Sequence, residues 1–482
     1  LGYNSMIRSA PLAVRLSSRR LSSSISSQCS AFSGSGRIQS EFCSKALTSM
    51  RNPSHRYFSS STLHDISTVD IDSDSRIYAG DVPLPLTTDC TIFEADDIPT
   101  GKYPVFRVMD ENGVIRDDAK GPQYIDPELN EEHAVKMFRT MSRLNVMDNI
   151  FLNAQRQGRI SFYMSSQGEE AVHIGSASAL DNKDVIFAQY RETGVLMWRG
   201  FTMSQFADQC FSNSGDLGKG RQMPVHYGSR ALNFHTISSP LTTQLPQAAG
   251  AAYAMKMEAI RNGSNRAAGV TVCYFGDGAA SEGDFHAAMN IAATMDAPII
   301  FFCRNNGFAI STPVADQYRG DGIASRAKGY GMASIRVDGN DLFAVNAATA
   351  RAKELALSEN RPVLIETMSY RVGHHSTSDD STRYRSTEEI KKWDNEDNPI
   401  DRFRRFCEAK GWLDEERVQT IRDEEKINVL QALESAEKKG PPALATMFDD
   451  VYKEKTPELE RQEAKLLEHV AKYPERYTGP GH

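Results

Sequence analysis

Short runs rich in β-branched and aromatic residues alternate with longer stretches of helical spacing through the middle of this chain. The runs predict strands at Val185–Ala188, Val270–Phe275, Ile299–Cys303, Ile335–Val337 and Val363–Thr367. Helical patterns cover Leu245–Arg261, Phe285–Met295 and Leu342–Ser358. Strands that alternate with helices pair in parallel, because each connection crosses back over the sheet. The sequence therefore predicts an α/β fold in which helices cover both faces of a parallel sheet.

The first 60 residues differ in composition from the rest of the chain. They contain seven Arg, one Lys and eighteen Ser, with Glu41 as the single acidic residue. An Arg-rich, Ser-rich and acid-poor segment is typical of a mitochondrial transit peptide. We therefore predict a transit peptide at 1–60, a mature chain that starts near Ser59, and a location in the mitochondrial matrix.

Three further segments follow the predicted transit peptide. Residues 61–127 are acidic and rich in turn-forming residues, which predicts an extended N-terminal arm. Residues 128–387 form the predicted α/β domain, whose helical spacing begins at Glu128. Residues 388–482 are highly charged, and their spacing predicts a helical C-terminal extension without a catalytic role.

Charge and cysteine content argue against several classes of protein. With 55 Lys and Arg against 63 Asp and Glu, the net charge of −8 argues against nucleic-acid binding. No window approaches 18 consecutive apolar residues, so we expect no membrane insertion. The seven cysteines are scattered and form no Cys-x-x-Cys pair, which argues against a disulfide framework and a structural zinc site.

A Gly-Asp-Gly sequence follows directly on the predicted strand Val270–Phe275. Glycines on both sides of Asp277 permit a tight turn and a close approach of the backbone to a ligand. We expect Ser281 to cap the next helix, which would direct its positive N-terminus at a bound phosphate and its metal. Gly-Asp-Gly is also an ordinary turn, so it is a weak signal alone.

A second polar loop follows the next predicted strand, Ile299–Cys303. One crossover helix fits between the two loops, so both should lie at the same edge of the sheet, where ligands bind. Asp277 and Asn306 then offer two oxygens to Mg²⁺, and the backbone carbonyl of Phe308 offers a third.

Gly-Asp-Gly followed after 26 residues by Asn-Asn at a strand end is the signature of thiamin-diphosphate enzymes. Residues 130 to about 460 resemble the α subunits of the decarboxylating component of branched-chain 2-oxoacid dehydrogenases. Five motifs carry this resemblance: Gln189–Glu192, Ser238–Leu241, the Gly-Asp-Gly block, Arg304–Thr312 and Tyr370–Asp380. The resemblance implies a three-layer α/β/α thiamin-diphosphate-binding fold. It also implies oxidative decarboxylation of branched-chain 2-oxoacids with transfer of the acyl group to a lipoyl group.

The resemblance implies ligands for three cofactors. Mg²⁺ would be held by Asp277, Asn306 and Phe308. Thiamin diphosphate would be contacted by Tyr190, Arg191, Ser239, Leu241, Gly278, Ala279, Arg304 and His375. A potassium ion that orders the cofactor loop would be held by Ser238, Pro240, Thr243 and Gln244.

Catalysis and regulation are implied for the loop that begins at Gly373. His375 would act as the acid–base group, since an imidazole titrates near neutral pH. Ser376, beside it, would be the main phosphorylation site of a regulatory kinase, and Ser386 a lesser one. A phosphate at Ser376 would draw in the nearby Arg371, Arg383 and Arg385 and pull the loop from its working form.

The resemblance also implies partner chains. No segment resembles the pyrimidine-binding half of a thiamin enzyme, so the carboxylic acid needed on that side must come from another polypeptide. We expect a β subunit in an α₂β₂ heterotetramer, a lipoyl-bearing transacylase core, and a regulatory kinase and phosphatase.

Three other functions are considered. The nearest is a pyruvate or acetoin dehydrogenase α subunit, which differs in substrate. A metallohydrolase would instead hold zinc with His226, His235, His374 and His375. A non-catalytic homologue would serve only as a scaffold, although Asp277, Asn306 and His375 are all intact.

Overall fold

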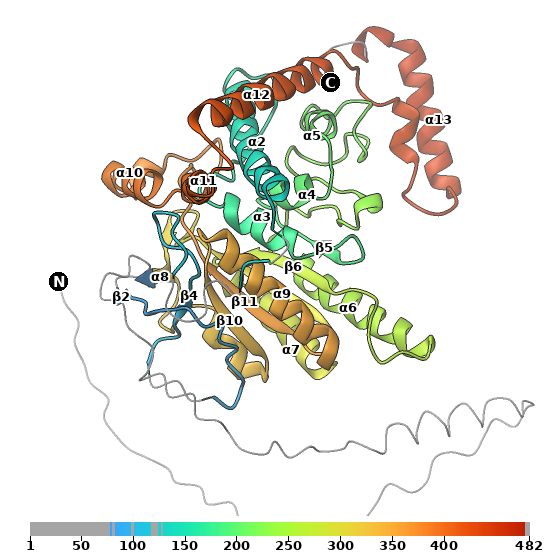
Figure 1. The fold of residues 1–482 in the computed structure, drawn as a ribbon. Helices are drawn as coiled ribbons and strands as arrows, with labels where there is room; N and C mark the ends of the chain where they lie inside the picture. The colour runs from blue at the N-terminus through green and yellow to red at the C-terminus, as the bar shows by residue number, and fades with distance from the viewer. Residues whose placement is uncertain (1–77, 80–81, 98–100, 117–123, 127–128, 478–482) are drawn as a thin grey trace, which may run out of the picture. The chain divides into compact units, whose positions relative to one another are not determined.

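A parallel sheet forms the centre of the computed structural model, which describes residues 78–79, 82–97, 101–116, 124–126 and 129–477 (Figure 1). The predicted transit peptide and its cleavage site lie outside these residues. The sheet has seven strands in the order β3-β4-β10-β11-β7-β6-β5, and all its pairings are parallel. Its five longer strands are β5 (Val185–Phe187), β6 (Thr271–Gly276), β7 (Ile299–Asn305), β10 (Ala333–Asp338) and β11 (Val363–Met368).

The five predicted strands are all confirmed, and their ends differ from the prediction by no more than two residues. Every residue of β7, β10 and β11 is buried. Side chains of β7 alternate between two hydrophobic clusters on opposite faces of the sheet. Phe301 belongs to one cluster and Phe302 to the other, as the period of two along a strand requires.

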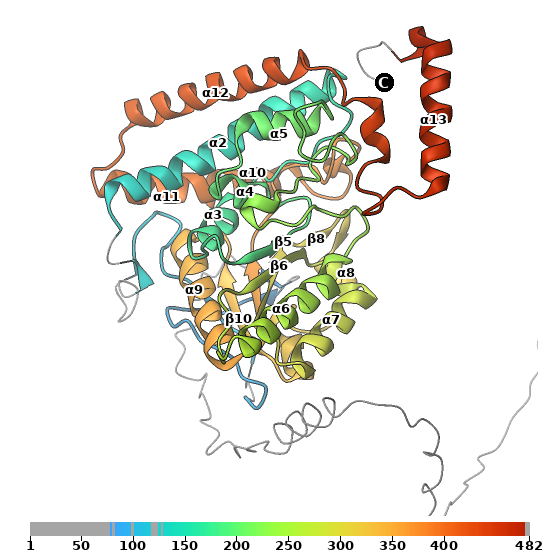
Figure 2. The ribbon, with the colours of Figure 1, turned by 90° about the vertical axis from the view of Figure 1, so that its right-hand side faces the viewer.

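Helices cover both faces, which confirms the predicted layers. The helices α6 (Gln244–Arg261) and α7 (Gly283–Thr294) share their cluster with Phe301 on one side. The helices α3 (Glu170–Ser178) and α9 (Leu342–Glu359) share theirs with Phe302 on the other. Figure 2 shows α6 and α7 side by side in front of the strands. Shorter helices complete the central part: α4 (Thr193–Trp198), α5 (Met203–Cys210) and α8 (Val314–Gln317).

The segment predicted as an extended arm contributes to the sheet. Its strands β3 (Leu86–Thr87) and β4 (Val105–Phe106) lie beyond β10 and extend the sheet on that side. Ahead of them, β1 (Tyr78–Ala79) and β2 (Val82–Pro83) form a separate antiparallel pair. Strands of two residues are too short to show a period, so the sequence pattern could not reveal them.

The C-terminal part is helical, as predicted. It contains α10 (Thr387–Glu396), α11 (Pro399–Ala409), α12 (Glu415–Glu437) and α13 (Pro457–Lys472). The long helix α12 packs along α2 (Glu131–Arg156), as both views show. Buried Arg402 of α11 pairs with Asp338 at the end of β10 at 2.9 Å, which ties this part to the sheet.

Two observations within the described residues concern membrane crossing and cysteines. None of the helices in the described ranges combines the length and the apolar character that a membrane crossing requires. The cysteines described there are free thiols: Cys90, Cys210, Cys273, Cys303 and Cys407.

Candidate active site

The two predicted metal loops meet at the carboxyl ends of β6 and β7. Gly276 pairs with Arg304 across the strands, and the backbone N–H of Asp277 donates to the carbonyl of Arg304 at 3.2 Å. The side chains of Asp277 and Asn306 are both buried. The prediction that one crossover helix brings the loops together at one edge is therefore confirmed.

The start of α7 differs from the prediction. Residues Ala279–Ser281 form a turn of 3-10 helix, and α7 begins only at Gly283, with Glu282 at the N-cap position. The prediction that Ser281 caps this helix is wrong, because the extra turn moves the helix start past it. The side chain of Glu282 makes no capping hydrogen bond either.

A small hairpin closes against the Gly-Asp-Gly turn. It is formed by β8 (Phe308–Ala309) and β9 (Thr312–Pro313). A Cβ atom added to Gly278 would lie 2.7 Å from the Cβ of Ala309, so any side chain at this position would force the two loops apart. Gly278 therefore keeps Phe308, which carries the third predicted metal ligand, close to the loop of Asp277.

Asp277 lies in an environment that suits a bound cation. Its carboxylate accepts a hydrogen bond of 2.8 Å from the amide of Gln317, and burial raises its pKa to about 6. The neighbouring amide oxygen of Gln317 is buried without a partner among the described residues. Carboxylate and amide oxygens are the ligands that Mg²⁺ prefers, so the residues present fit this ion.

Arg304 is held between two buried glutamates. Its Nη1 donates to Glu169 at 3.0 Å, and its Nε donates to Glu192. Burial alone would lower the pKa of Arg304, but the carboxylates of Glu192 and Glu169 raise it above its ordinary value. Two of its nitrogens therefore face carboxylates, although the sequence predicted a contact with a diphosphate.

Arg191 brings two other predicted cofactor residues together. Its Nη2 donates to the backbone carbonyl of His375 at 2.5 Å and lies 3.1 Å from Nδ1 of the same ring. The rings of Tyr190 and His375 meet edge to face, with centroids 6.1 Å apart. Tyr190, Arg191 and His375 thus form one cluster from segments 184 residues apart in the sequence.

The surroundings of His375 define where its proton sits. Nδ1 lies 3.1 Å from Arg191 and 3.4 Å from Arg371, and both guanidinium groups are donors only. Burial and these two positive charges lower the pKa of His375 to about 3. The ring is therefore neutral near pH 7, with Nδ1 as the acceptor and the proton on Nε2.

The loop that carries His375 is held by hydrogen bonds to its own residues. Asp379 accepts from the backbone N–H of His375 at 2.8 Å and from the hydroxyl of Tyr384 at 2.6 Å. Arg371 donates to the hydroxyl of Tyr384 at 2.9 Å, and Arg385 donates to the carbonyl of Gly373 at 2.9 Å. Two of the arginines expected to respond to a phosphate are thus already engaged in the loop's own structure.

The two predicted phosphorylation sites differ in their surroundings. Ser376 is partly buried, and its hydroxyl accepts from the backbone N–H of Ser378 at 3.3 Å within the loop. Ser386 is exposed and caps α10, because its hydroxyl accepts from the N–H of Glu389 at 3.0 Å.

The predicted potassium ligands lie on one turn that leads into α6. The hydroxyl of Thr243 donates to the carbonyl of Pro240 at 3.2 Å, and the amide of Gln244 donates to the carbonyl of Tyr274 in β6 at 3.1 Å. Ser238, the fourth predicted ligand, is partly buried at the start of this segment.

Two predicted cofactor contacts lie on the same turn. Ser239 and the buried ring of His226 are joined by a hydrogen bond of 2.8 Å. Leu241 is exposed on this turn. Ala279, by contrast, is buried in the 3-10 turn after Gly278.

Sequence reasoning missed the buried acids of the site. Glu192 directly follows Tyr190 and Arg191 in a matched motif, so its position gave a signal. Glu169 gave none, because it lies before α3 and not at the end of a predicted strand. Gly168, with a φ of +91°, allows the backbone before Glu169 to approach the carbonyl of Tyr370. A Cβ atom at this position would lie 2.2 Å from that oxygen.

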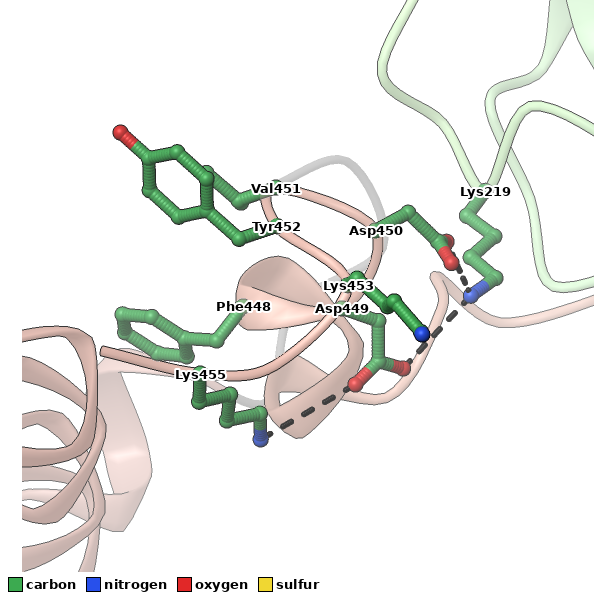
Figure 3. Close-up of a pocket in the computed structure, with 8 residues that line it drawn as sticks. All are labelled: Lys219, Phe448, Asp449, Asp450, Val451, Tyr452, Lys453 and Lys455. Carbon is green, nitrogen blue, oxygen red and sulfur yellow. Dashed lines mark hydrogen bonds and ion pairs between the residues drawn. The ribbon is translucent and has the colours of Figure 1, made fainter. Parts of the chain in front are cut away.

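A surface pocket lies apart from all predicted site residues. It is lined by Lys219, by residues Phe448–Lys453 and by Lys455, and Figure 3 shows Lys219 and Lys455 directed at the carboxylates of Asp449 and Asp450. Lys219 pairs with Asp450 at 2.9 Å and with Asp449 at 3.5 Å. These side chains link the C-terminal segment to the loop after α5.

Known proteins similar to this chain share most of its length. Residues 138–445 match the family described as "Dehydrogenase E1 component". This chain belongs to the dehydrogenase E1 component family. The chain is 54% identical over 374 residues to "2-oxoisovalerate dehydrogenase subunit alpha, mitochondrial" of Homo sapiens, covering 78% of this chain and 81% of that protein. It is 53% identical over 403 residues to the protein of the same name in Caenorhabditis elegans, covering 84% and 90%.

Because the chain belongs to the E1 family, the alternative that it is a zinc metallohydrolase is rejected. In the described ranges, no three His, Cys, Asp or Glu side chains are grouped to hold a metal ion. The four histidines of that hypothesis have other contacts: His226 with Ser239, His235 with Phe187, His374 with Ser381, and His375 with Arg191.

Proposed function

We propose that this chain is the α subunit of the decarboxylase component of a mitochondrial branched-chain 2-oxoacid dehydrogenase. The observation that carries the proposal is the sequence identity of 53–54% to proteins named 2-oxoisovalerate dehydrogenase subunit alpha, mitochondrial. The match covers 81% of the human protein and 90% of the nematode protein. These names favour a branched-chain substrate over the pyruvate or acetoin alternative. The reaction is oxidative decarboxylation, with transfer of the acyl group to the lipoyl group of a transacylase.

The site fits thiamin diphosphate with Mg²⁺. Thiamin diphosphate, when bound, would supply a carbon nucleophile and an electron sink for decarboxylation. The buried oxygens of Asp277 and Asn306, with the Phe308 carbonyl, would hold the metal. Tyr190, Arg191 and Arg304 would contact the diphosphate, with Ser239, Leu241, Gly278 and Ala279 along the cofactor. The turn Ser238–Gln244 would hold the potassium ion.

His375 would serve the reaction as a neutral ring. With Nδ1 accepting from Arg191 and Arg371, its Nε2–H is the donor left for a substrate oxygen or a lipoyl sulfur. A neutral ring with this tautomer can donate a hydrogen bond from Nε2 to an oxygen or sulfur that gains negative charge, as a neutral imidazole does when it polarises a carbonyl. The buried guanidinium of Arg191 holds the ring in one orientation throughout.

Partner chains complete the proposal. The name "subunit alpha" implies a β subunit. We propose that this β subunit joins the chain in an α₂β₂ heterotetramer and supplies the acid on the pyrimidine side of the cofactor. A lipoyl-bearing transacylase would receive the acyl group. A kinase that acts on Ser376, with a phosphatase that reverses it, would regulate the site through the loop of His375.

Co-expression with the β subunit tests the proposal. The assembled enzyme should decarboxylate 2-oxoisovalerate in preference to pyruvate, leave acetoin uncleaved, and acylate an added lipoyl domain. The isolated chain should show no decarboxylation and only poor binding of thiamin diphosphate. A preference for pyruvate in the assembled enzyme, or full activity of the isolated chain, would overturn the assignment.

A further inference from the structure

Glu169 is a buried carboxylate in contact with Asn306, a proposed magnesium ligand. It lies at the N-cap of α3, and its side chain is fully buried. Its Oε1 accepts hydrogen bonds from three side chains that lie in the last residues of β7 or directly after β7 and β11. They are Arg304 at 3.0 Å, Asn306 at 3.2 Å and Ser369 at 3.5 Å.

We propose that Glu169 is a positioning residue that orients the amide of Asn306 so that its oxygen faces the magnesium ion. The inference rests on the proposed function, because it assumes that Asn306 is a ligand of this ion. In this role Glu169 holds the amide of Asn306 in the orientation that magnesium binding requires.

The two ends of an Asn amide differ in their chemistry. The oxygen binds a cation and the nitrogen repels it, yet both ends have nearly the same shape. A carboxylate can only accept hydrogen bonds, so it pairs with the nitrogen and never with the oxygen. The contact between Glu169 and Nδ2 therefore turns Oδ1 the other way, toward the backbone N–H of Phe308 at 3.3 Å. That is the side on which the third predicted ligand lies.

Arg304 keeps Glu169 in place for this task. Their ion pair of 3.0 Å joins two side chains with no more than 2% exposure. The other carboxylate oxygen of Glu169, Oε2, is buried without a hydrogen-bond partner among the described residues. A buried carboxylate oxygen without a donor is costly, so a ligand or water that donates to Oε2 would complete this site.

Glu192 offers a matched control within the same cluster. It is equally buried and also pairs with Arg304. Its other oxygen accepts from the backbone N–H of Gln189 at 2.6 Å. Glu192 thus shares the burial, the charge and the arginine of Glu169, but it has no contact with Asn306.

The experiment measures metal binding and not only activity. Magnesium is titrated into the assembled α and β subunits with thiamin diphosphate present, and binding is followed by calorimetry. Glu169→Gln should weaken magnesium binding by about 10- to 100-fold, the usual effect of losing the group that orients a ligand. Glu192→Gln should change it by less than about threefold. Equal losses in the two variants would overturn the proposal.

A second background separates orientation from general damage. Asn306→Asp replaces the amide by a carboxylate, whose two oxygens are equivalent and need no orientation. Adding Glu169→Gln to Asn306→Asp should therefore cost no further affinity. The same fold loss in both backgrounds would overturn the proposal.

Two further outcomes are distinguishable. If Glu169→Gln does not fold, Glu169→Asp keeps the charge and withdraws the acceptor from Asn306, and unchanged magnesium affinity in that variant overturns the proposal. If the unaltered enzyme binds thiamin diphosphate equally well without magnesium, the proposed metal site itself is wrong, and the role of Glu169 falls with it.

Discussion

Two groups of ion pairs in this protein have opposite settings. At the ends of β6 and β7, Arg304 lies between Glu169 and Glu192, and none of the three side chains is more than 2% exposed. At the C-terminal segment, Lys219 pairs with Asp449 and Asp450 (Figure 3). The side chains of Lys219, Asp449 and Asp450 are 38%, 42% and 66% exposed, respectively. Each group joins one cation to two carboxylates, and the large difference between them is contact with water.

The difference in exposure determines what each group of ion pairs contributes to the protein. Water screens the exposed pairs, so they add little to stability and hold the segment only loosely. The buried pairs lose their hydration, and removing one partner leaves a charge without compensation. A buried cluster is therefore weak evidence for stability but a strong constraint on geometry. In this protein it lies where the geometry of a metal and a diphosphate would matter.

The largest effect is expected from the metal loop itself. Asp277→Ala removes a buried carboxylate that we propose as a magnesium ligand, so magnesium-dependent binding of thiamin diphosphate should be abolished while the fold remains. Calorimetry and circular dichroism on the assembled enzyme measure the two properties. Asp284→Ala, an exposed acid in the first turn of α7, is the control and should bind normally. Unchanged cofactor affinity in Asp277→Ala would refute the proposed site.

Breaking the buried cluster should come next. Arg304→Met leaves Glu169 and Glu192 buried without their shared cation, so the free energy of unfolding should fall by about 3–5 kcal/mol. Urea denaturation of the assembled enzyme without cofactor measures this loss. Arg383→Met is the control, since this side chain is 83% exposed beside Asp380. If the two variants were equally stable, the contrast between buried and exposed pairs would not hold in this protein.

Loss of the His375 ring tests chemistry without disturbing the buried pairs. His375→Ala should retain cofactor binding and lower acylation of the lipoyl group by about 10²–10⁴-fold, the usual contribution of a positioned acid–base group. Single-turnover assays with a lipoyl domain measure the step. His374→Ala, whose ring contacts Ser381 instead, should stay within a few-fold of the unaltered enzyme. Turnover that survives in His375→Ala would remove the proposed role.

A negative charge in the loop of His375 should have a smaller but clear effect. Ser376→Glu adds charge next to His375, so it should crowd the loop and lower turnover by at least about tenfold. Ser386→Glu should matter far less, because an acidic group at the N-cap of α10 interacts favourably with the helix. Steady-state assays of both variants decide the comparison. Full activity of Ser376→Glu, with the same result for the stoichiometrically phosphorylated enzyme, would contradict regulation at this site.

The smallest effect is expected at the exposed pairs. Lys219→Met removes the cation shared by Asp449 and Asp450, and the melting temperature should change by no more than about 2 °C. Differential scanning calorimetry at low and high salt measures it, since screening should erase even this difference. A drop as large as that of Arg304→Met would show that exposure does not separate the two groups.

The sequence predicted the outline of the sheet and of the site because both depend on local signals. Five strands were found from their apolar runs, and the loops of Asp277 and Asn306 were placed at one edge because parallel strands end there together. Local signals failed at Ser281, where a 3-10 turn displaces the helix start, and at β3 and β4, which are too short for a pattern. The predicted boundaries of the arm, the central domain and the extension remain predictions.

The sequence by itself determined the fold class, the family and which residues stand in the matched motifs. Only the tertiary structure decided how these residues meet: that Arg304 faces two carboxylates, that Glu169 contacts Asn306, and that Arg191 fixes the proton of His375 on Nε2. The physical reason lies in range. Periodicity and turn chemistry act over a few residues, whereas these contacts join segments more than a hundred residues apart and depend on how the strands pair and the helices pack.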